Sequence, residues 1–354
     1  MSAAVTARAD DRLEGAARDG VLRFLAAAPW ASHEQHPDWP RFRPAARRHR
    51  YLHLRAFDGD ALVAYALARL SPLAAGYRLA FLRRGPVTHR TGDLTRVIPA
   101  FQRALKARGV ATLVLNPRWQ DGDAETARAA IAGLGGRVLP PEQQSVHRLT
   151  PIVDLSGTGA ELSARLKARG RRQIRQCERM GLVVSRVTSG EEAMAFAPVF
   201  DAFMHRRGLD AGAVPGVAEQ WAMAEAGGAM FLGRYEGAVI CGHTVVVEGD
   251  RAFWLTMAGR DTPRDMPRNA ALVWQAMLWA QAQGLRWYDM AGAPATDAAD
   301  SGAEGRQQFK AGFNPTLVAL VPMMALPVRP LAHAVLFPAR QFWRARRAGQ
   351  GWRR

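Results

Sequence analysis

Cysteine is almost missing from this chain of 354 residues, which contains only Cys177 and Cys241. The two cysteines lie far apart and have neither a CxxC spacing nor a histidine-rich neighbourhood. This pattern argues against a disulfide framework and against a zinc site, and it indicates a reducing compartment. We therefore predict a protein that holds no metal and no resident cofactor.

Long apolar runs are missing as well. The most apolar stretch covers residues 317–328 and contains two prolines, whereas a membrane-spanning helix needs about 20 apolar residues. The N-terminus mixes acidic and basic residues and lacks the apolar region of a signal peptide. We expect a cytoplasmic protein.

Lysine is scarce too. Only Lys106, Lys167 and Lys310 are lysines among 48 basic residues, and the net charge is +17. Because the planar guanidinium group suits phosphate, one interpretation is a phosphorylated or nucleic-acid partner. The other is a genome-wide preference for arginine codons. The arginines are spread along the whole chain, which argues against a dedicated nucleic-acid module.

The length and the composition indicate two globular domains. Hydrophobic residues make up 48% and charged residues 22% of the chain, and one core rarely serves more than about 200 residues. Up to residue 150 the pattern predicts two β-rich runs over 50–88, the first of them a hairpin with a DGD turn, and a helix over 94–109 that ends at Gly109. A strand over 110–119 and a helix over 123–136 follow. This is an α/β pattern.

The second half of the chain also has an α/β pattern, but its predicted elements follow a different order. A basic helix over 160–181, interrupted or kinked at Gly170, precedes three strands within 229–261. A helix over 268–284, a strand over 285–292 and a last strand over 317–326 follow. This order is that of the acetyltransferase (GNAT) fold.

The predicted fold class is therefore α/β (α+β), with two tandem GNAT-like domains built on mixed central sheets flanked by helices. We place the domains at 1–150 and 151–328, and a basic amphipathic helix at 329–354. That helix is expected to dock on its domain, with a peripheral membrane contact as the alternative.

Four motifs resemble those of the Fem family of peptidoglycan-bridge aminoacyltransferases. They are FLRRGPV (81–87), RLKARGRRQIRQCERMG (165–181), YDMAG (288–292) and GRQQFKAGFN (305–314). The resemblance implies two acetyltransferase-like domains and transfer of an amino acid from aminoacyl-tRNA to an amine of a peptidoglycan precursor. It also implies that Arg84 and Gly85 line an acceptor cleft.

Lys310 is the residue most strongly predicted to be catalytic. It resembles the family's functional lysine, and a fixed cation there can stabilise the oxyanion that forms when an amine attacks an aminoacyl ester. A surface lysine in a loop between strands is the alternative. Phe309 is predicted to line the substrate site or to anchor the loop in the core.

Two further pairs of residues are candidates. In the YDMAG motif, Tyr288 is predicted to contact substrate, and Asp289 either accepts the amine's proton or caps the following turn through an Asx bond. On the basic helix, Arg172 and Arg175 share one side with other arginines. That side either binds a polyanion such as a diphosphate or tRNA, or is simply solvated.

The segment over 260–270 bears on the identity of the acyl donor. Ordinary acetyltransferases hold coenzyme A on a glycine-rich loop at a helix N-terminus, but residues 260–270 contain two prolines and no glycine. We therefore expect aminoacyl-tRNA, or another activated acyl donor, and a cell-envelope acceptor such as a peptidoglycan peptide or an amino sugar. The alternatives are an N-acyltransferase that uses acyl-CoA or acyl carrier protein in exopolysaccharide or lipid biosynthesis, and a non-catalytic relative that binds glycan or tRNA.

Overall fold

The computed structural model describes residues 4–42, 49–144, 147–209, 214–261, 263–292 and 303–350, with the side chains of 303 and 342–350 left out. The chain forms two compact units, each with its own sheet. Unit 1 contains the described parts of 1–39, 48–146 and 320–354, and unit 2 contains those of 40–47 and 147–319. The two-domain architecture predicted from the sequence is confirmed.

Unit 1 is built on a mixed sheet in the order β1-β2-β3-β4-β6-β15-β7, with β5 paired to β3. Its strands are β1 (Thr6–Asp10), β2 (Arg50–Asp58), β3 (Ala61–Pro72), β4 (Arg78–Leu82), β5 (Val87–Thr88), β6 (Val110–Leu115), β7 (Arg137–Val138) and β15 (Met324–Pro327). Its longer helices are α1 (Gly15–Ala27), α2 (Leu94–Ala107), α3 (Asp121–Gly133) and α11 (Pro330–Gln350).

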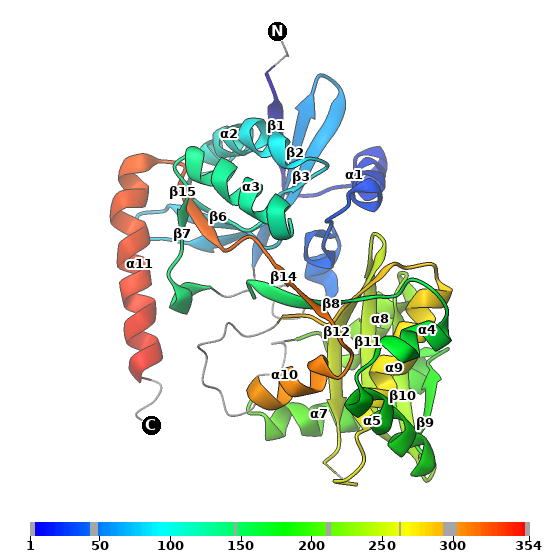
Figure 1. Ribbon diagram of the computed structural model, residues 1–354. Coiled ribbons are helices and arrows are strands. Elements are labelled where there is room, and N and C mark those ends of the chain that lie inside the picture. Colours follow the sequence, from blue (N-terminus) through cyan, green and yellow to red (C-terminus); the bar gives the residue numbers. More distant parts are fainter. Residues whose placement is uncertain are drawn as a thin grey trace. The chain divides into compact units, whose positions relative to one another are not determined.

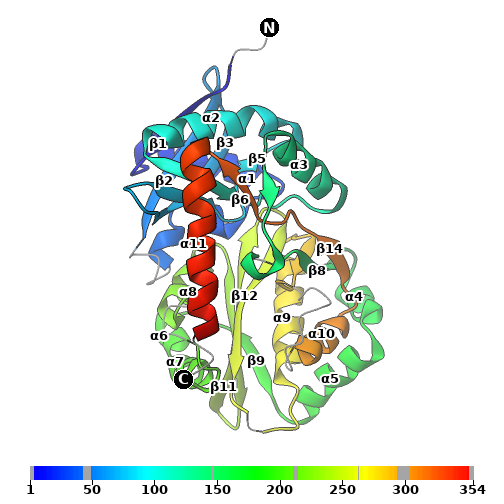
Figure 2. The same ribbon diagram turned by 90° about the vertical axis from the view of Figure 1, so that its left-hand side faces the viewer.

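Alternating side chains give this sheet two apolar faces, and different helices cover them (Figures 1 and 2). Ala80 and Leu82 of β4 point into the core that α2 and α3 share. Leu79 and Phe81 point to the other face, where Phe337 of α11 packs. The period of two residues along a strand explains why one strand serves both layers.

Unit 2 contains a second mixed sheet in the order β14-β8-β13-β12-β11-β10-β9. The strands are β8 (Leu149–Asp154), β9 (Val183–Arg186), β10 (Ala229–Tyr235), β11 (Ala238–Glu248), β12 (Arg251–Gly259), β13 (Trp287–Asp289) and β14 (Thr316–Ala319). The helices are α4 (Gly159–Arg165), α5 (Ala168–Arg179), α6 (Gly190–Met194), α7 (Ala197–Arg206), α8 (Val217–Glu225), α9 (Arg268–Ala282) and α10 (Ala303–Ala311).

Two cores sandwich this second sheet. Ala229 and Phe231 of β10 belong to the core that α4, α5 and α9 build, whereas Met230 and Leu232 belong to the core of α6, α7 and α8. The long helix α9 connects β12 to β13, and these two strands are parallel. It is the crossover that positions the site described below.

Two predicted elements differ from the structure. The strand predicted over 317–326 is divided: β14 pairs with β8 in unit 2, and β15 pairs with β6 and β7 in unit 1. Residues 320–328, predicted to belong to the second domain, therefore lie in the first unit. Pro322 separates the two strands in the sequence, which is where a strand can end without losing a ladder hydrogen bond.

The basic helix over 160–181 is interrupted, but not at Gly170. Leu166 and Lys167 have extended backbone between α4 and α5, and the Lys167 N–H donates to the Gly312 carbonyl at 3.0 Å. Gly170 lies inside α5, where a Cβ atom would collide with the Gly312 carbonyl oxygen. The break and the glycine together bring α5 against the segment that follows α10.

Candidate active site

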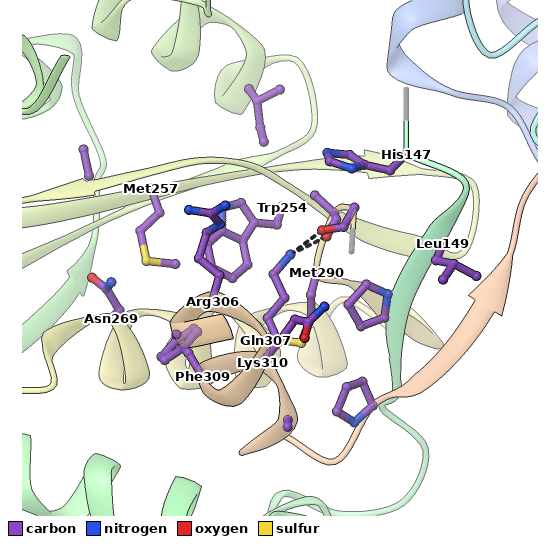
Figure 3. Close-up of a pocket in the computed structure, with 18 of the residues that line it drawn as sticks. His147, Leu149, Trp254, Met257, Asn269, Met290, Arg306, Gln307, Phe309 and Lys310 are labelled. Atoms are coloured by element: carbon purple, nitrogen blue, oxygen red, sulfur yellow. Dashed lines mark hydrogen bonds between the residues drawn. The ribbon is translucent and has the colours of Figure 1, made fainter. Parts of the chain in front are cut away.

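The site lies where two parallel strands separate. Residues 251–253 of β12 pair with residues 287–289 of β13, and within the described residues the pairing of these two strands stops there. A pocket of about 910 Å³ occupies the space between the later part of β12 and residues 290–292 (Figure 3). Ligands in α/β sheets typically bind at the carboxyl ends of parallel strands, and this volume suits a small-molecule site.

The described lining of the pocket combines apolar walls with basic groups. Aromatic and aliphatic side chains form most of it, the basic groups are His147, Arg207, Arg306 and Lys310, and no aspartate or glutamate is among the lining residues that the structure describes. Such a surface attracts negative charge.

Lys310 projects from α10 into this pocket, not from a loop between strands. Its Nζ donates to the carbonyl oxygens of Ala291 at 2.5 Å and Gly292 at 2.8 Å, as the dashed lines in Figure 3 show. The ammonium group also lies 5.5 Å from the centroid of the Trp254 ring, within the range of a cation–π contact. These contacts hold the cation in one position.

Burial changes the acidity of this lysine. It lowers the pKa of Lys310 to about 8, while the charge of Asp289 opposes that change and Arg306 adds to it. At pH 7 the group is therefore still mostly protonated. It titrates close enough to neutrality for the rate of a reaction to report its charge.

Asp289 supports Lys310 indirectly. Its carboxylate is fully buried and accepts hydrogen bonds from the Thr150 hydroxyl at 2.5 Å and from the Ala291 N–H at 2.9 Å. The second bond is the Asx bond considered for this residue, and Ala291 itself has a positive φ of 54°. A carboxylate enclosed in this way is not among the residues that line the pocket. The geometry therefore favours the turn cap over the base, and a catalytic role of Asp289 stays a prediction.

Tyr288 has no access to the pocket either. Its side chain is fully buried, and its hydroxyl lies 2.6 Å from Nε2 of His243. His243 Nδ1 lies 2.7 Å from the Thr256 carbonyl, so Nδ1 carries the proton and Nε2 accepts from the tyrosine. Burial lowers the pKa of His243 to about 4, which keeps it neutral. The Tyr288 side chain is therefore part of the core, and its contact with substrate stays a prediction.

Phe309 lies in the lining of the pocket beside Lys310. Its ring meets Trp254 edge-on at 6.3 Å between centroids and Phe313 at 5.4 Å. Phe313 is fully buried and belongs to the core. The three rings thus connect the pocket wall to the core, while contact of Phe309 with substrate stays a prediction.

The remaining predicted residues do not line this pocket. Arg172 and Arg175 are exposed on α5. Arg84 and Gly85 belong to unit 1, where the Arg84 N–H donates to the Asn116 side chain at 3.1 Å. A Cβ atom on Gly85 would lie 2.6 Å from the Gln35 side-chain oxygen. Their roles in substrate binding stay predictions.

His147 and Arg306 are among the lining residues that the sequence analysis missed. His147 precedes β8, and its ring lies directly against Gly292 on the other side of the carbonyls from Lys310 (Figure 3). Arg306 lies one turn before Lys310 on α10. The i,i+4 spacing of Arg306 and Lys310 was a usable signal, but nothing in the sequence connects His147 to this site.

The family model of the acetyltransferase (GNAT) domain matches residues 164–310 of this chain. The matched residues all belong to unit 2. The match covers α5, the strands β9–β13 and the helix α10 with its lysine. The chain is an acyltransferase, as the motifs predicted, and the split between β12 and β13 lies inside the matched domain.

Solved structures with the same fold support the doubled architecture. FemX shares 15% identity over 91% of this chain and 99% of its own, with a TM-score of 0.76. A tandem GNAT protein from the clavulanic acid biosynthesis pathway shares 14% identity over 91% of this chain and 98% of its own, with a TM-score of 0.52. L-PGS from Bacillus licheniformis shares 15% identity over 80% and 86%, with a TM-score of 0.52. At these identities the likeness shows the fold, and the resemblance to Fem-type acyltransferases is confirmed at that level. None of the curated proteins matches the chain.

Proposed function

We propose that this acyltransferase acylates an amine of a cell-envelope precursor, such as a peptidoglycan peptide or an amino sugar, with aminoacyl-tRNA as the donor. The main support for the proposal is the hydrogen bonding of Lys310. An ammonium group has three N–H donors, and Lys310 uses two of them for the carbonyl oxygens of Ala291 and Gly292. The third is available to a ligand in a pocket whose other basic groups also favour negative charge.

The reaction that this geometry supports is direct aminolysis. The neutral amine of the acceptor attacks the ester carbonyl, a C–N bond forms, and negative charge develops on the carbonyl oxygen. The remaining N–H of Lys310 stabilises that oxyanion, because the lysine is already fixed and needs no reorganisation. The C–O bond then breaks, and the ribose hydroxyl leaves with the proton that the amine gives up. No covalent enzyme intermediate is required.

Different observations support the proposed acceptor and the proposed donor. The four Fem-like motifs and the FemX fold support an envelope precursor as acceptor. The loop into α9 supports a donor other than coenzyme A, because it has no glycine and because Pro263 and Pro267 lack the N–H groups that a phosphate cradle would use. The Arg268 guanidinium also bends back toward the Pro263 carbonyl at 3.3 Å.

A second candidate is an N-acyltransferase that uses acyl-CoA. The observation that favours it is the family match itself, which describes an acetyltransferase domain. In this alternative Arg264 and Arg268 would contact the diphosphate through their side chains. The chemistry at Lys310 would be the same, and only the leaving group would differ.

Mass spectrometry of envelope precursors distinguishes these possibilities. Precursors from a strain that lacks the protein are compared with those from strains that express the wild type or Lys310→Ala. We expect one amide-linked substituent to disappear in the deletion strain, to return with the wild type and to stay absent with Lys310→Ala. A substituent with the mass of an amino acid supports the first proposal, and one with the mass of an acetyl or longer acyl group supports the second. Identical precursors in all strains would contradict both.

A further inference from the structure

The helix α11 has an inner face that holds it to unit 1. Phe337 is buried and packs with Phe81 and Met323. One turn earlier on the same face, Nδ1 of His333 lies 2.9 Å from the Thr112 hydroxyl, and Thr112 is fully buried. The docked helix expected from the sequence is therefore present, and its opposite face is available for something else.

That opposite face is apolar and exposed. Leu331 is 87% exposed and Val335 is 68% exposed, and Leu331 is the most exposed large apolar residue in the part of the chain that the structure describes. Ala334 and Pro338 are exposed between and after them. Steps of three and four residues place these side chains along one side of a helix. We call this strip, formed by Leu331, Ala334, Val335 and Pro338, the outer face of α11.

The sequence that contains the outer face carries charge of a single sign. Glu304 is the last acidic residue of the chain, and residues 305–354 contain nine lysines and arginines. Seven of the nine arginine and lysine positions follow β14: Arg329, Arg340, Arg344, Arg346, Arg347, Arg353 and Arg354. A helix with an apolar side and only basic charge is the kind that lies in the interface of an anionic bilayer.

We propose that the outer face of α11 docks on a bilayer that contains anionic phospholipid. Leu331 and Val335 enter the boundary between head groups and acyl chains, and the basic C-terminal segment meets the phosphates. No described helix has the length and hydropathy to cross a membrane, so α11 lies on the surface. A second copy of this chain would bury the apolar strip but bring two sets of positive charge together, which disfavours it. RNA would satisfy the charge but leave the strip exposed.

Vesicle flotation at low salt tests this inference without any acyl-transfer assay. The full-length protein is mixed with vesicles of phosphatidylcholine alone or with phosphatidylglycerol added. We expect binding to the anionic vesicles only, and a loss of about tenfold or more in the double variant Leu331→Ser/Val335→Ser, because two apolar side chains no longer leave water. The matched control is Val183→Ser on β9, where valine is 65% exposed, and this variant should bind like the wild type.

Three outcomes would overturn the inference. They are no flotation of the wild type with anionic vesicles, equal flotation of the double variant, and equal loss in the Val183→Ser control. A dimer seen by sedimentation velocity that the double variant dissolves would assign the outer face to a second copy instead. Circular dichroism and thermal unfolding establish that the double variant is folded, which is expected because both side chains are exposed.

Discussion

Opposing effects determine the pKa of Lys310. Burial favours the neutral amine and lowers the pKa of Lys310 to about 8, and Asp289 counteracts this through its negative charge. The two backbone carbonyls and the Trp254 ring also favour the charged form. The residue is thus a cation at neutral pH that becomes neutral under mildly alkaline conditions.

Removing the charge of Asp289 tests this balance directly. In Asp289→Asn the side-chain oxygen still accepts from Thr150 and Ala291, but the charge that raises the pKa of Lys310 is lost. We expect a lower pKa for Lys310, measured by NMR titration of protein labelled with ¹³Cε-lysine. Only three lysines are present, so the Lys310→Ala spectrum assigns the signal.

Thr150→Val is the matched control for that titration. It removes the other hydrogen bond to Asp289 without changing any charge, so the pKa of Lys310 should move much less than in Asp289→Asn. Equal pKa values in Asp289→Asn and the wild type would show that Asp289 does not influence the lysine.

At this scale the sequence predicted the lysine but not its surroundings. Lys310 and Phe309 lie in a motif, and the Asx bond of Asp289 follows from local turn chemistry. The burial of Tyr288 does not follow locally, because it depends on His243, which is 45 residues away on a different strand. His147 reaches the pocket only through the pairing of β8 with β13.

Among the elements, α5 shows how a glycine determines packing. Gly170 faces the Gly312 carbonyl so closely that a Cβ atom would collide with it, and Gly312 follows the helix that carries Lys310. We expect Gly170→Ala to lower the free energy of unfolding by about 1–3 kcal/mol and to reduce turnover as well, measured by urea denaturation and by the transfer assay.

Gly20→Ala is the control within the same chain. Gly20 lies inside α1, and a Cβ atom there meets nothing within 4 Å. The substitution should raise the free energy of unfolding by about 0.5–1 kcal/mol, because alanine loses less backbone entropy than glycine in a helix. Equal effects of the two substitutions would contradict the assigned packing of Gly170.

Element existence was predicted better than element ends. The hairpin β2–β3 and the helices α2 and α9 follow from turn residues and helical periodicity, and Gly109 ends α2 with a φ of 73° as expected. The single strand predicted over 317–326 was wrong, because an apolar run does not say which sheet each half joins. Only long-range pairing with β8 and β6 decides that.

For the whole molecule, the end of the chain completes the first unit. β15 lies between β6 and β7 in the sheet of unit 1, and Met324 and Leu326 are fully buried there. A chain that ends at Ala319 should lose unit 1, since the loss of these two side chains alone costs about 4 kcal/mol or more. Hydrogen exchange should show β6 unprotected while β11 and β12 stay protected.

A chain that ends at Gln341 provides the comparison. It keeps β15 and the part of α11 that packs through Phe337, so β6 should remain protected. Protection of β6 in the shorter chain would show that unit 1 does not depend on the last strand.

In the proposed reaction, a protonated Lys310 stabilises the oxyanion of N-acyl transfer. The most direct test is the pH dependence of kcat/KM for the wild type and Lys310→Ala, with Lys106→Ala as the exposed-lysine control. We expect the wild-type value to fall as pH rises through about 8, where Lys310 loses its proton. We also expect Lys310→Ala to be about 100-fold slower or more at neutral pH and to lack this alkaline decrease. A Lys310→Ala variant with nearly wild-type rates, or with the same alkaline decrease, would contradict it.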